Sequence, residues 1–322
     1  MTIINKILNL SVLCFFLFGC GKKVVLNSVD YSISEVSKPT IFGEGIISIT
    51  DRSVFDVTFS PDGKTAYFTT RKGNDKQKIM ESNYENYTWT TPKVCVFSTD
   101  RDETPYITND GNTLYFGSQR AIEDYPNKGN FDMNIWKVSK TKMGWSSPSP
   151  LSQNINQSQI KDEEWPSSNA NLIYSNNDVD FIYCTMKRGT KSINIYETKL
   201  NNGEFSSSTK IENLFDDEKY WKYAAIYSRD GKYLIFNSSN VPIGVGGEDI
   251  FVSKKIANGW SKAVSIGNLV NTKAEESSPR FSRDGKYFFF ARENRVNTNE
   301  DGIWSIYFIE TKYLELDKLF KN

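Results

Sequence analysis

The stretch that decides the fold is Phe59-Ser60-Pro61-Asp62-Gly63-Lys64-Thr65-Ala66-Tyr67-Phe68. The same pattern returns at residues 107–116, 227–236 and 281–290, and a degenerate copy with Asn-Asp in its turn lies at 174–183. Asp-Gly and Asn-Asp tolerate the positive φ angles that a tight hairpin requires between two strands. The turns begin at positions 62, 110, 177, 230 and 284, so the sequence predicts five copies of a unit of about 55 residues.

A second periodicity divides each unit further. An isoleucine follows each turn, at positions 79, 135, 195, 250 and 303, and an aromatic residue follows each isoleucine ten positions later. Each unit therefore reads as four strands: one before the turn, one after it, one at the isoleucine and an outer one that starts at the aromatic residue. Four-stranded units repeated around an axis form a β-propeller. We expect an all-β chain with five blades, and six blades as the alternative. The aromatic residues, which we expect to pack between blades, are Trp89, Trp145, Phe205, Trp260 and Tyr313.

The repeat resembles that of a known family. The Phe-Ser-Pro-Asp-Gly-Lys signature with its following aromatic strand is similar to the WD-repeat-like unit of TolB and its relatives, over roughly residues 50–310. This resemblance implies the propeller fold. It leaves the function open, because such propellers serve as binding proteins, enzymes and peptidase lids.

A propeller also needs a contact that joins its first and last blades. Residues 39–42, Pro-Thr-Ile-Phe, resemble the outer-strand residues 92–95, Pro-Lys-Val-Cys. We therefore expect residues near 39–47 to supply the outer strand of the last blade. The competing candidate is the C-terminal segment 313–319, and use of both segments would permit a partial sixth blade.

The N-terminus carries an export signal. Lys6 precedes an apolar run that is too short to span a bilayer and is typical of a secretory signal. The run ends at Leu17-Phe18-Gly19-Cys20, which resembles a bacterial lipobox, in which the cysteine is lipidated. We expect a signal peptide over residues 1–19, a tether over 20–38 and one propeller domain over 39–322. Lipidation of Cys20 predicts an envelope protein held to a membrane by acyl chains, on the periplasmic side of the outer membrane or at the cell surface. An ordinary secretory signal is the alternative.

Composition excludes several classes of protein. The 322 residues hold 39 Lys and Arg against 39 Asp and Glu, whereas a nucleic-acid binder normally shows a basic excess. There is no histidine, which excludes Ser-His-Asp and Cys-His catalysis and histidine-ligated zinc. We expect no cofactor and no metal site, and any catalysis must use groups such as carboxylates, Lys or Tyr.

Charged loops indicate where a ligand would bind. The loops that lead into the innermost strands, here called leading loops, share one face with the loops between second and third strands, and the Asp-Gly turns lie on the other face. We call these the loop face and the turn face. The leading loops are acidic, and Trp165 and Trp221 lie beside their carboxylates, as suits a sugar or a peptide. In the alternative interpretation these charges are solvated or pair with one another. The expected ligand contacts are Arg71, Asp102, Glu103, Arg120, Glu163, Glu164, Trp165, Arg188, Glu218, Trp221, Glu276 and Arg292.

Three functions remain open at this point. The first is a non-catalytic envelope lipoprotein that binds a protein, peptide or glycan on the loop face. The second is a carboxylate enzyme that resembles the five-bladed glycan hydrolases, with Asp56, Glu103 and Glu164 as base, acid and pKa-tuning group by position. The third is a structural or assembly factor whose partner docks on the blade edges.

Overall fold

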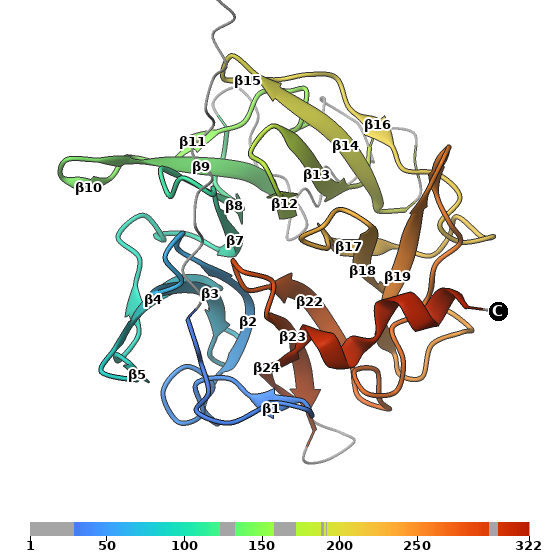
Figure 1. The fold of residues 1–322 in the computed structure, drawn as a ribbon. Coiled ribbons are helices and arrows are strands. Elements are labelled where there is room, and N and C mark those ends of the chain that lie inside the picture. Colours follow the sequence, from blue (N-terminus) through green and yellow to red (C-terminus); the bar gives the residue numbers. More distant parts are fainter. Residues whose placement is uncertain are drawn as a thin grey trace, which may run out of the picture.

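The structure is a computed structural model that describes residues 29–122, 133–157, 172–187, 190, 192–295 and 302–321. Five antiparallel sheets surround a central axis, as Figure 1 shows, and they form the predicted five-bladed propeller. The chain builds the first four blades from the axis outward, and the outermost strand of the fifth blade comes from the N-terminal end of the described chain.

The blades contain similar sets of strands, five in each of the first four blades and four in the fifth. The first contains β2 (Ser53–Phe59), β3 (Thr65–Arg71), β4 (Lys78–Glu85), β5 (Thr88–Trp89) and β6 (Lys93–Val94). The second contains β7 (Asp102–Ile107), β8 (Thr113–Ser118), β9 (Asn134–Thr141), β10 (Gly144–Trp145) and β11 (Ser149–Pro150). The third contains β12 (Leu172–Ser175), β13 (Asp180–Thr185), β14 (Asn194–Asn201), β15 (Glu204–Phe205) and β16 (Thr209–Lys210). The fourth contains β17 (Lys222–Tyr227), β18 (Tyr233–Ser239), β19 (Glu248–Ile256), β20 (Gly259–Trp260) and β21 (Val264–Ser265). The fifth contains β22 (Glu276–Phe281), β23 (Tyr287–Asn294), β24 (Ile303–Glu310) and β1 (Thr40–Ile41).

The predicted turns connect the first two strands of the blades. In the first blade Asp62 Oδ1 accepts hydrogen bonds from the Ser60 hydroxyl at 2.6 Å and from the Lys64 backbone at 3.0 Å. Gly63 has a φ of 72°, which glycine adopts without steric cost. The same Ser-to-Asp bond recurs at Ser228 and Ser282. A local side-chain motif thus sets the hairpins.

The outer strand differs from the prediction. In place of one strand, the first blade has two short ones, and both β5 and β6 pair with β4. Trp89 ends the first piece, and Pro92 stands between the two. The outer strand is divided in the same way in the third and fourth blades, where residues 206–208 and 261–263 contain no proline, so Pro92 is not the cause of the division.

Ring closure follows the prediction. β1 pairs antiparallel with β24, with Thr40 opposite Phe308. The competing C-terminal segment forms two short 3-10 helices instead, η1 (Thr311–Leu314) and η2 (Leu316–Phe320). None of the described helices is long and apolar enough to cross a membrane.

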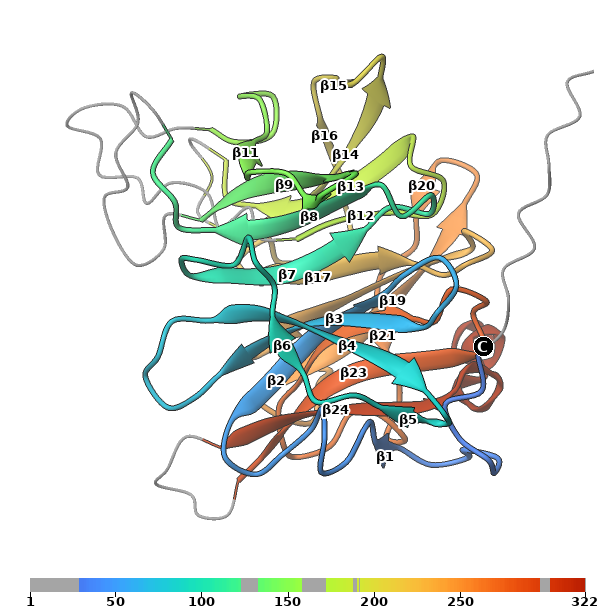
Figure 2. The same ribbon diagram turned by 90° about the vertical axis from the view of Figure 1, so that its left-hand side faces the viewer.

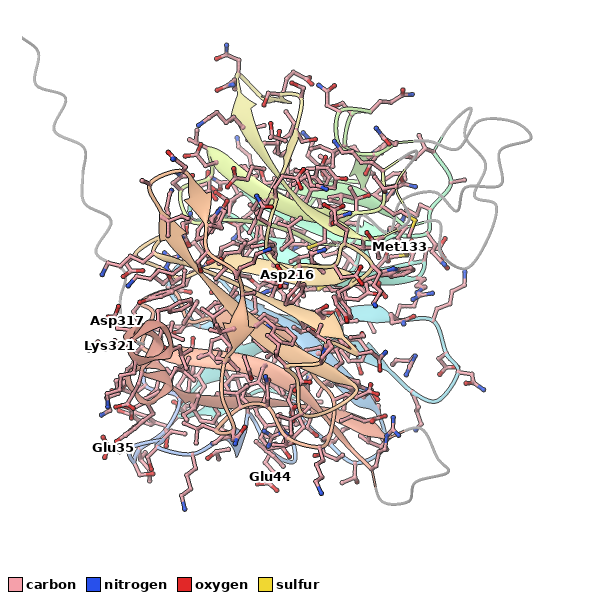
Figure 3. All side chains as sticks on the ribbon, turned by 90° about the vertical axis from the view of Figure 1, so that its right-hand side faces the viewer. Glu35, Glu44, Met133, Asp216, Asp317 and Lys321 are labelled. Atoms are coloured by element: carbon pink, nitrogen blue, oxygen red, sulfur yellow. The ribbon has the colours of Figure 1, made fainter. Side chains whose placement is uncertain are left out.

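The two faces of the propeller carry different segments. Figure 2 shows the propeller from the side, with the C-terminus on the turn face. Figure 3 places Glu35, Asp317 and Lys321 at that same side and Met133 at the opposite one. The described N-terminal segment also packs on the turn face, because the Tyr31 hydroxyl donates to the Gly63 carbonyl at 2.8 Å. The loop face therefore has neither terminus of the described chain over it.

Candidate functional site

The innermost strands bend at equivalent places. Four of them carry a β-bulge, and each bulge holds a non-glycine residue in the left-handed region: Asp56 (φ 57°), Thr104 (φ 54°), Ala224 (φ 47°) and Ser278 (φ 54°). Left-handed backbone is unfavourable for most residues, above all for a β-branched threonine. Bulges of this kind re-aim side chains beside functional sites. Here all four residues line one pocket of about 230 Å³ at the loop-face mouth of the channel.

Asp56 and Ser278 join the first and fifth blades inside this pocket. The Ser278 hydroxyl donates to Asp56 Oδ1 at 2.6 Å, and both side chains are buried. Burial raises the pKa of the Asp56 carboxyl, while the charge of Arg280 and the Ser278 bond act in the opposite direction. The net result is a raised pKa for this buried carboxyl.

Two arginines fill the channel beyond the pocket. Arg280 is only 2% exposed and donates from Nη1 to the Pro279 carbonyl at 2.7 Å. Its Nε and Nη2 atoms have no hydrogen-bond partner among the described residues. Nearer the turn face, Arg283 donates to the carbonyls of Phe59 and Ile107, both at 2.6 Å. Because these carbonyls belong to the first and second blades, Arg283 spans the channel and closes its end.

Glu248, a carboxyl group on the fourth blade, has a raised pKa. Burial raises the pKa of Glu248 to about 8, and the nearby charge of Glu275 acts in the same direction. The amide of Asn237 donates to Glu248, and the Asn237 carbonyl oxygen accepts from the Ser278 backbone at 3.3 Å. Glu248 is therefore mostly protonated at neutral pH, so it can act as a hydrogen-bond donor or as an acid.

An aromatic cleft adjoins the pocket. Trp221 and Tyr223 lie with ring centroids 6.0 Å apart and line a cleft of about 470 Å³. Tyr223 and Ser239 line both this cleft and the channel pocket, so the two hollows adjoin. A ligand in the pocket can thus extend over an aromatic surface.

Four of the expected contact residues lie in buried ion pairs instead. The Asp102 carboxylate is fully buried and accepts from Arg120 Nη2 at 3.0 Å. The Glu276 carboxylate is likewise fully buried and accepts from Arg292 Nε at 2.7 Å. The cause is the strand register, since Glu276 stands directly opposite Arg292 in the ladder. In these two blades the charges pair with one another, as in the alternative interpretation.

The remaining expected residues are divided. Glu103 lines the channel pocket, at 9% exposure, beside Arg101 Nη2 at 3.4 Å. Arg71 is half-buried at the end of β3, opposite Ser53. Glu218 is exposed and accepts from Lys210 at 2.9 Å, away from the channel. Four further expected residues and the lipidation cysteine lie outside the described residues: Glu163, Glu164, Trp165, Arg188 and Cys20.

Sequence reasoning missed several residues of the pocket. Glu248 follows a glycine-rich run that indicates only a loop, and Asn237 and Ser278 lie within ordinary strand patterns. Arg280 occupies the same position in its strand as a small or apolar residue does elsewhere. No local signal marks these residues, because only the closed ring brings them together.

Comparisons with known proteins bear on the fold. No protein-family model matches the chain, and no similar sequence was found among curated proteins. TolB from Acinetobacter baumannii is similar in structure, with 17% identity and a TM-score of 0.48, over 81% of this chain and 52% of that one. A putative TolB from Agrobacterium tumefaciens has 14% identity and a TM-score of 0.48, over 81% and 78% of the two chains. A thermostable family-43 glycoside hydrolase has 12% identity and a TM-score of 0.49, over 82% and 90%.

These likenesses concern the propeller alone. This chain spans about half the length of the A. baumannii TolB. The five sheets of this chain confirm the propeller that the TolB-like repeat predicts, and the function has to be argued from the site.

Proposed function

We propose that this chain is an exported, lipid-anchored propeller that binds a protein, peptide or glycan at the channel mouth on its loop face, without catalysis. The observation that carries the proposal is the channel itself, which is open to the loop face and closed by Arg283. Its pocket of about 230 Å³ has room for one side chain or one sugar unit, and the Trp221 cleft beside it can hold the next unit.

The polar groups of the pocket favour an uncharged, oxygen-rich ligand. Asp56 and Glu103 offer carboxylate oxygens, and Glu248, with its pKa raised to about 8, offers a proton to donate. The unpartnered atoms of Arg280 supply a buried positive charge that balances Asp56. Hydroxyl, amide and carbonyl groups match such a mixture of acceptors and donors.

The anchor fits this orientation. Cys20 is the proposed lipidation site, and residues 31–36 pack on the propeller beyond it. Tyr31 and the Lys286–Asp30 ion pair attach this segment to the turn face. The ten residue steps from Cys20 to Asp30 span at most about 35 Å. The turn face would therefore lie near the membrane, and the pocket would open away from it. A Cys20→Ser variant that stays in the membrane fraction after signal cleavage would contradict the anchor.

The binding proposal is tested by a screen of glycans, peptidoglycan fragments and envelope peptides against the purified protein, with product analysis of every hit. We expect an intact bound ligand, and an affinity that falls at least about tenfold in Trp221→Ala, because stacked aromatic contacts dominate such sites. Glu218→Gln is the matched control, since Glu218 lies nearby but pairs with Lys210. If the Trp221→Ala variant bound the ligand as tightly as the parent protein, the proposal that the ligand binds on the loop face would be contradicted.

A specific observation favours a second candidate, a glycan hydrolase. Hydrolases of this kind use a pair of carboxyls, and the pocket contains Glu248 and Asp56. The pKa of Glu248 is raised to about 8, and the pKa of Asp56 is also raised by burial, with the charge of Arg280 acting in the opposite direction. Glu248 would then be the acid, in place of Glu103, the acid expected from its position in the sequence. Cleavage of a bound glycan that Glu248→Gln abolishes, with binding retained, would support this candidate over the binding protein.

A further inference from the structure

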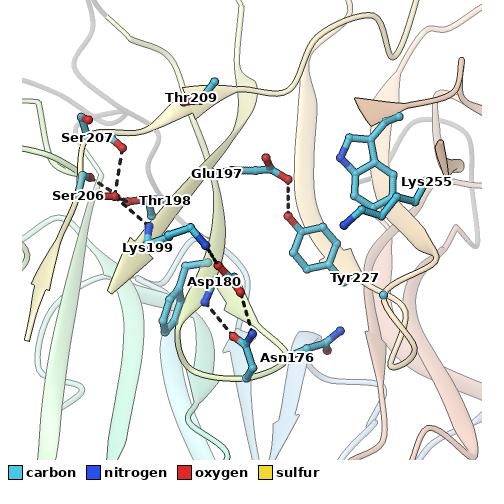
Figure 4. A pocket seen from close by; sticks show the side chains of 14 residues that line it. Asn176, Asp180, Glu197, Thr198, Lys199, Ser206, Ser207, Thr209, Tyr227 and Lys255 are labelled. Carbon is cyan, nitrogen blue, oxygen red and sulfur yellow. Dashed lines mark hydrogen bonds and ion pairs between the residues drawn. The ribbon is translucent and has the colours of Figure 1, made fainter. Parts of the chain in front are cut away.

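A second large cleft lies away from the channel. It has a volume of about 630 Å³ and opens between the third and fourth blades, on the side of the Asp-Gly turns. Figure 4 shows its lining, with Asp180, Glu197 and Lys199 from the third blade and Tyr227 and Lys255 from the fourth. Trp260 also lines the cleft and stacks on Tyr227, with ring centroids 5.6 Å apart and an interplanar angle of 13°.

The equivalent groove between the fifth and first blades is filled. Phe59 and Trp89 end the innermost and first outer strands of the first blade, just as Tyr227 and Trp260 do in the fourth. Tyr31 stacks on both of them, with ring centroids 5.1 Å from Phe59 and 5.7 Å from Trp89. This groove therefore holds a tyrosine from an extended segment of the chain itself.

The turns of the two grooves also correspond. The Tyr31 hydroxyl donates to the Gly63 carbonyl, and the turn of the fourth blade places Gly231 at the same position, with φ 71° against 72°. Gly231 lines the empty cleft. A tyrosine bound there would find the two equivalent aromatic positions and the same carbonyl acceptor. The two pairs differ in geometry, because Phe59 and Trp89 are tilted by 41° with ring centroids 6.3 Å apart, whereas Tyr227 and Trp260 stack directly on each other.

The groove between the fourth and fifth blades is also covered by an aromatic side chain from elsewhere in the chain. The C-terminal helix η2 reaches from the fifth blade back to the fourth, where Phe320 stacks on Tyr233 at 5.9 Å and 24°. Segments at both ends of the described chain thus cover grooves on the turn face with an aromatic ring. The cleft between the third and fourth blades has the aromatic floor, and no described segment lies in it.

We propose that this cleft is a second binding site, which accepts a tyrosine side chain from an extended segment of a partner protein. The walls also indicate the neighbouring residues of that segment. When the third and fifth blades are aligned by their strand registers, Glu197 takes the position of Phe308 and Asp180 takes the position of Tyr287. The third-blade wall of the cleft is therefore charged where the fifth-blade wall of the filled groove is apolar. The partner segment would therefore flank its tyrosine with polar residues, which can pair with Glu197, Lys199 and Lys255.

The probe for the test is a peptide copied from residues 29–38 of this chain, Val-Asp-Tyr-Ser-Ile-Ser-Glu-Val-Ser-Lys, because that segment already fits the filled groove. Fluorotryptophan in the full chain gives a fluorine NMR signal for each of its seven tryptophans, and a Trp260→Phe variant assigns the one of interest. The Trp260 signal should shift as peptide is added and reach saturation, with a midpoint at or below about 1 mM. The peptide with alanine at the tyrosine position should bind at least about tenfold more weakly.

Two variants sharpen the result. Glu197→Phe gives the cleft the apolar wall of the filled groove and should tighten binding of the peptide severalfold. The Glu197 side chain is exposed, and the substitution also removes the hydrogen bond that it accepts from the Tyr227 hydroxyl at 2.8 Å. Trp145→Phe, at the same repeat position in the second blade, should leave binding unchanged.

Four outcomes would overturn the proposal. One is an unshifted Trp260 signal at several times that concentration, and another is an equal shift with the alanine peptide. The third is a shift that appears only with oligosaccharides, which would assign the cleft to a glycan. A shift of the Trp89 signal alone would likewise contradict it, since the peptide would then be displacing Tyr31 from its own groove.

Discussion

The carboxylate of Asp102 and the guanidinium of Arg120 form an ion pair inside the second blade, with Arg120 Nη2 3.0 Å from Asp102 Oδ2. Arg120 also donates to the Phe97 carbonyl at 2.5 Å, so the pair ties the leading loop to the end of β8. Asp102 is fully buried, and a buried charge is tolerated only while it is compensated. The pair belongs to the architecture of the blade.

Loss of Arg120 should therefore destabilise the protein strongly. In Arg120→Ala the Asp102 carboxylate is left buried without its partner, and we expect the free energy of unfolding to fall by about 3–5 kcal/mol. Urea denaturation measures this change. Lys76→Ala is the control, because Lys76 forms an exposed pair with Asp100, and its loss should cost at most about 1 kcal/mol. Equal effects in the two variants would show that the buried pair is not a structural contact.

The closure of the ring should depend on Phe42. Its side chain is 1% exposed, and its ring contacts Phe59 of the first blade and Phe289 and Phe308 of the fifth. Phe42→Ala leaves a cavity between the two blades and should cost about 3–5 kcal/mol in unfolding experiments. Val94→Ala, on the half-exposed outer strand β6, should change stability by less than about 1 kcal/mol. A mild effect of Phe42→Ala would mean that β1 does not hold the ring closed.

Glu248 should make stability depend on pH. Burial raises its pKa in the folded protein to about 8 from an ordinary value of 4.5, so the folded state binds this proton more tightly than the unfolded state does. The stabilisation is fully present below pH 4.5 and is lost as the pH rises through about 8. In Glu248→Gln the fall in stability between these values should be smaller by about 1–3 kcal/mol, as measured by denaturation across the pH range. Identical pH profiles of the variant and the parent would contradict this assignment.

Two glycines provide a matched test of N-terminal docking. Gly63 and Gly231 have φ angles of 72° and 71°, so alanine at either position pays the same backbone strain of about 1–2 kcal/mol. A Cβ at Gly63 would also lie 2.9 Å from Val29 Cγ2 and 3.0 Å from the Tyr31 hydroxyl, whereas a Cβ at Gly231 would meet nothing within 4 Å. Gly63→Ala should therefore cost about 1–2 kcal/mol more than Gly231→Ala. Equal costs would mean that residues 29–31 do not rest on this turn.

Much of the fold could be predicted from local signals. The Asp-Gly turns, the five-unit period and the trailing aromatic residues act over a few positions each, and the closure by residues 39–42 followed from a second copy of an outer-strand pattern. The divided outer strand was missed, because a period-two pattern does not show where the ladder is interrupted. Trp260 also departs from the expected packing between blades, since it stacks on Tyr227 of its own blade.

The site could be predicted less well, for a physical reason. Leading-loop charges signal polarity, but only the strand register decides whether Glu276 faces a ligand or its partner Arg292. By itself the sequence determined the repeat, its turns and the aromatic positions, because each depends on the chemistry of neighbouring residues. Only the tertiary structure decided the channel pocket: Asp56 and Ser278 meet across 222 positions, and the closed ring alone brings their side chains into contact.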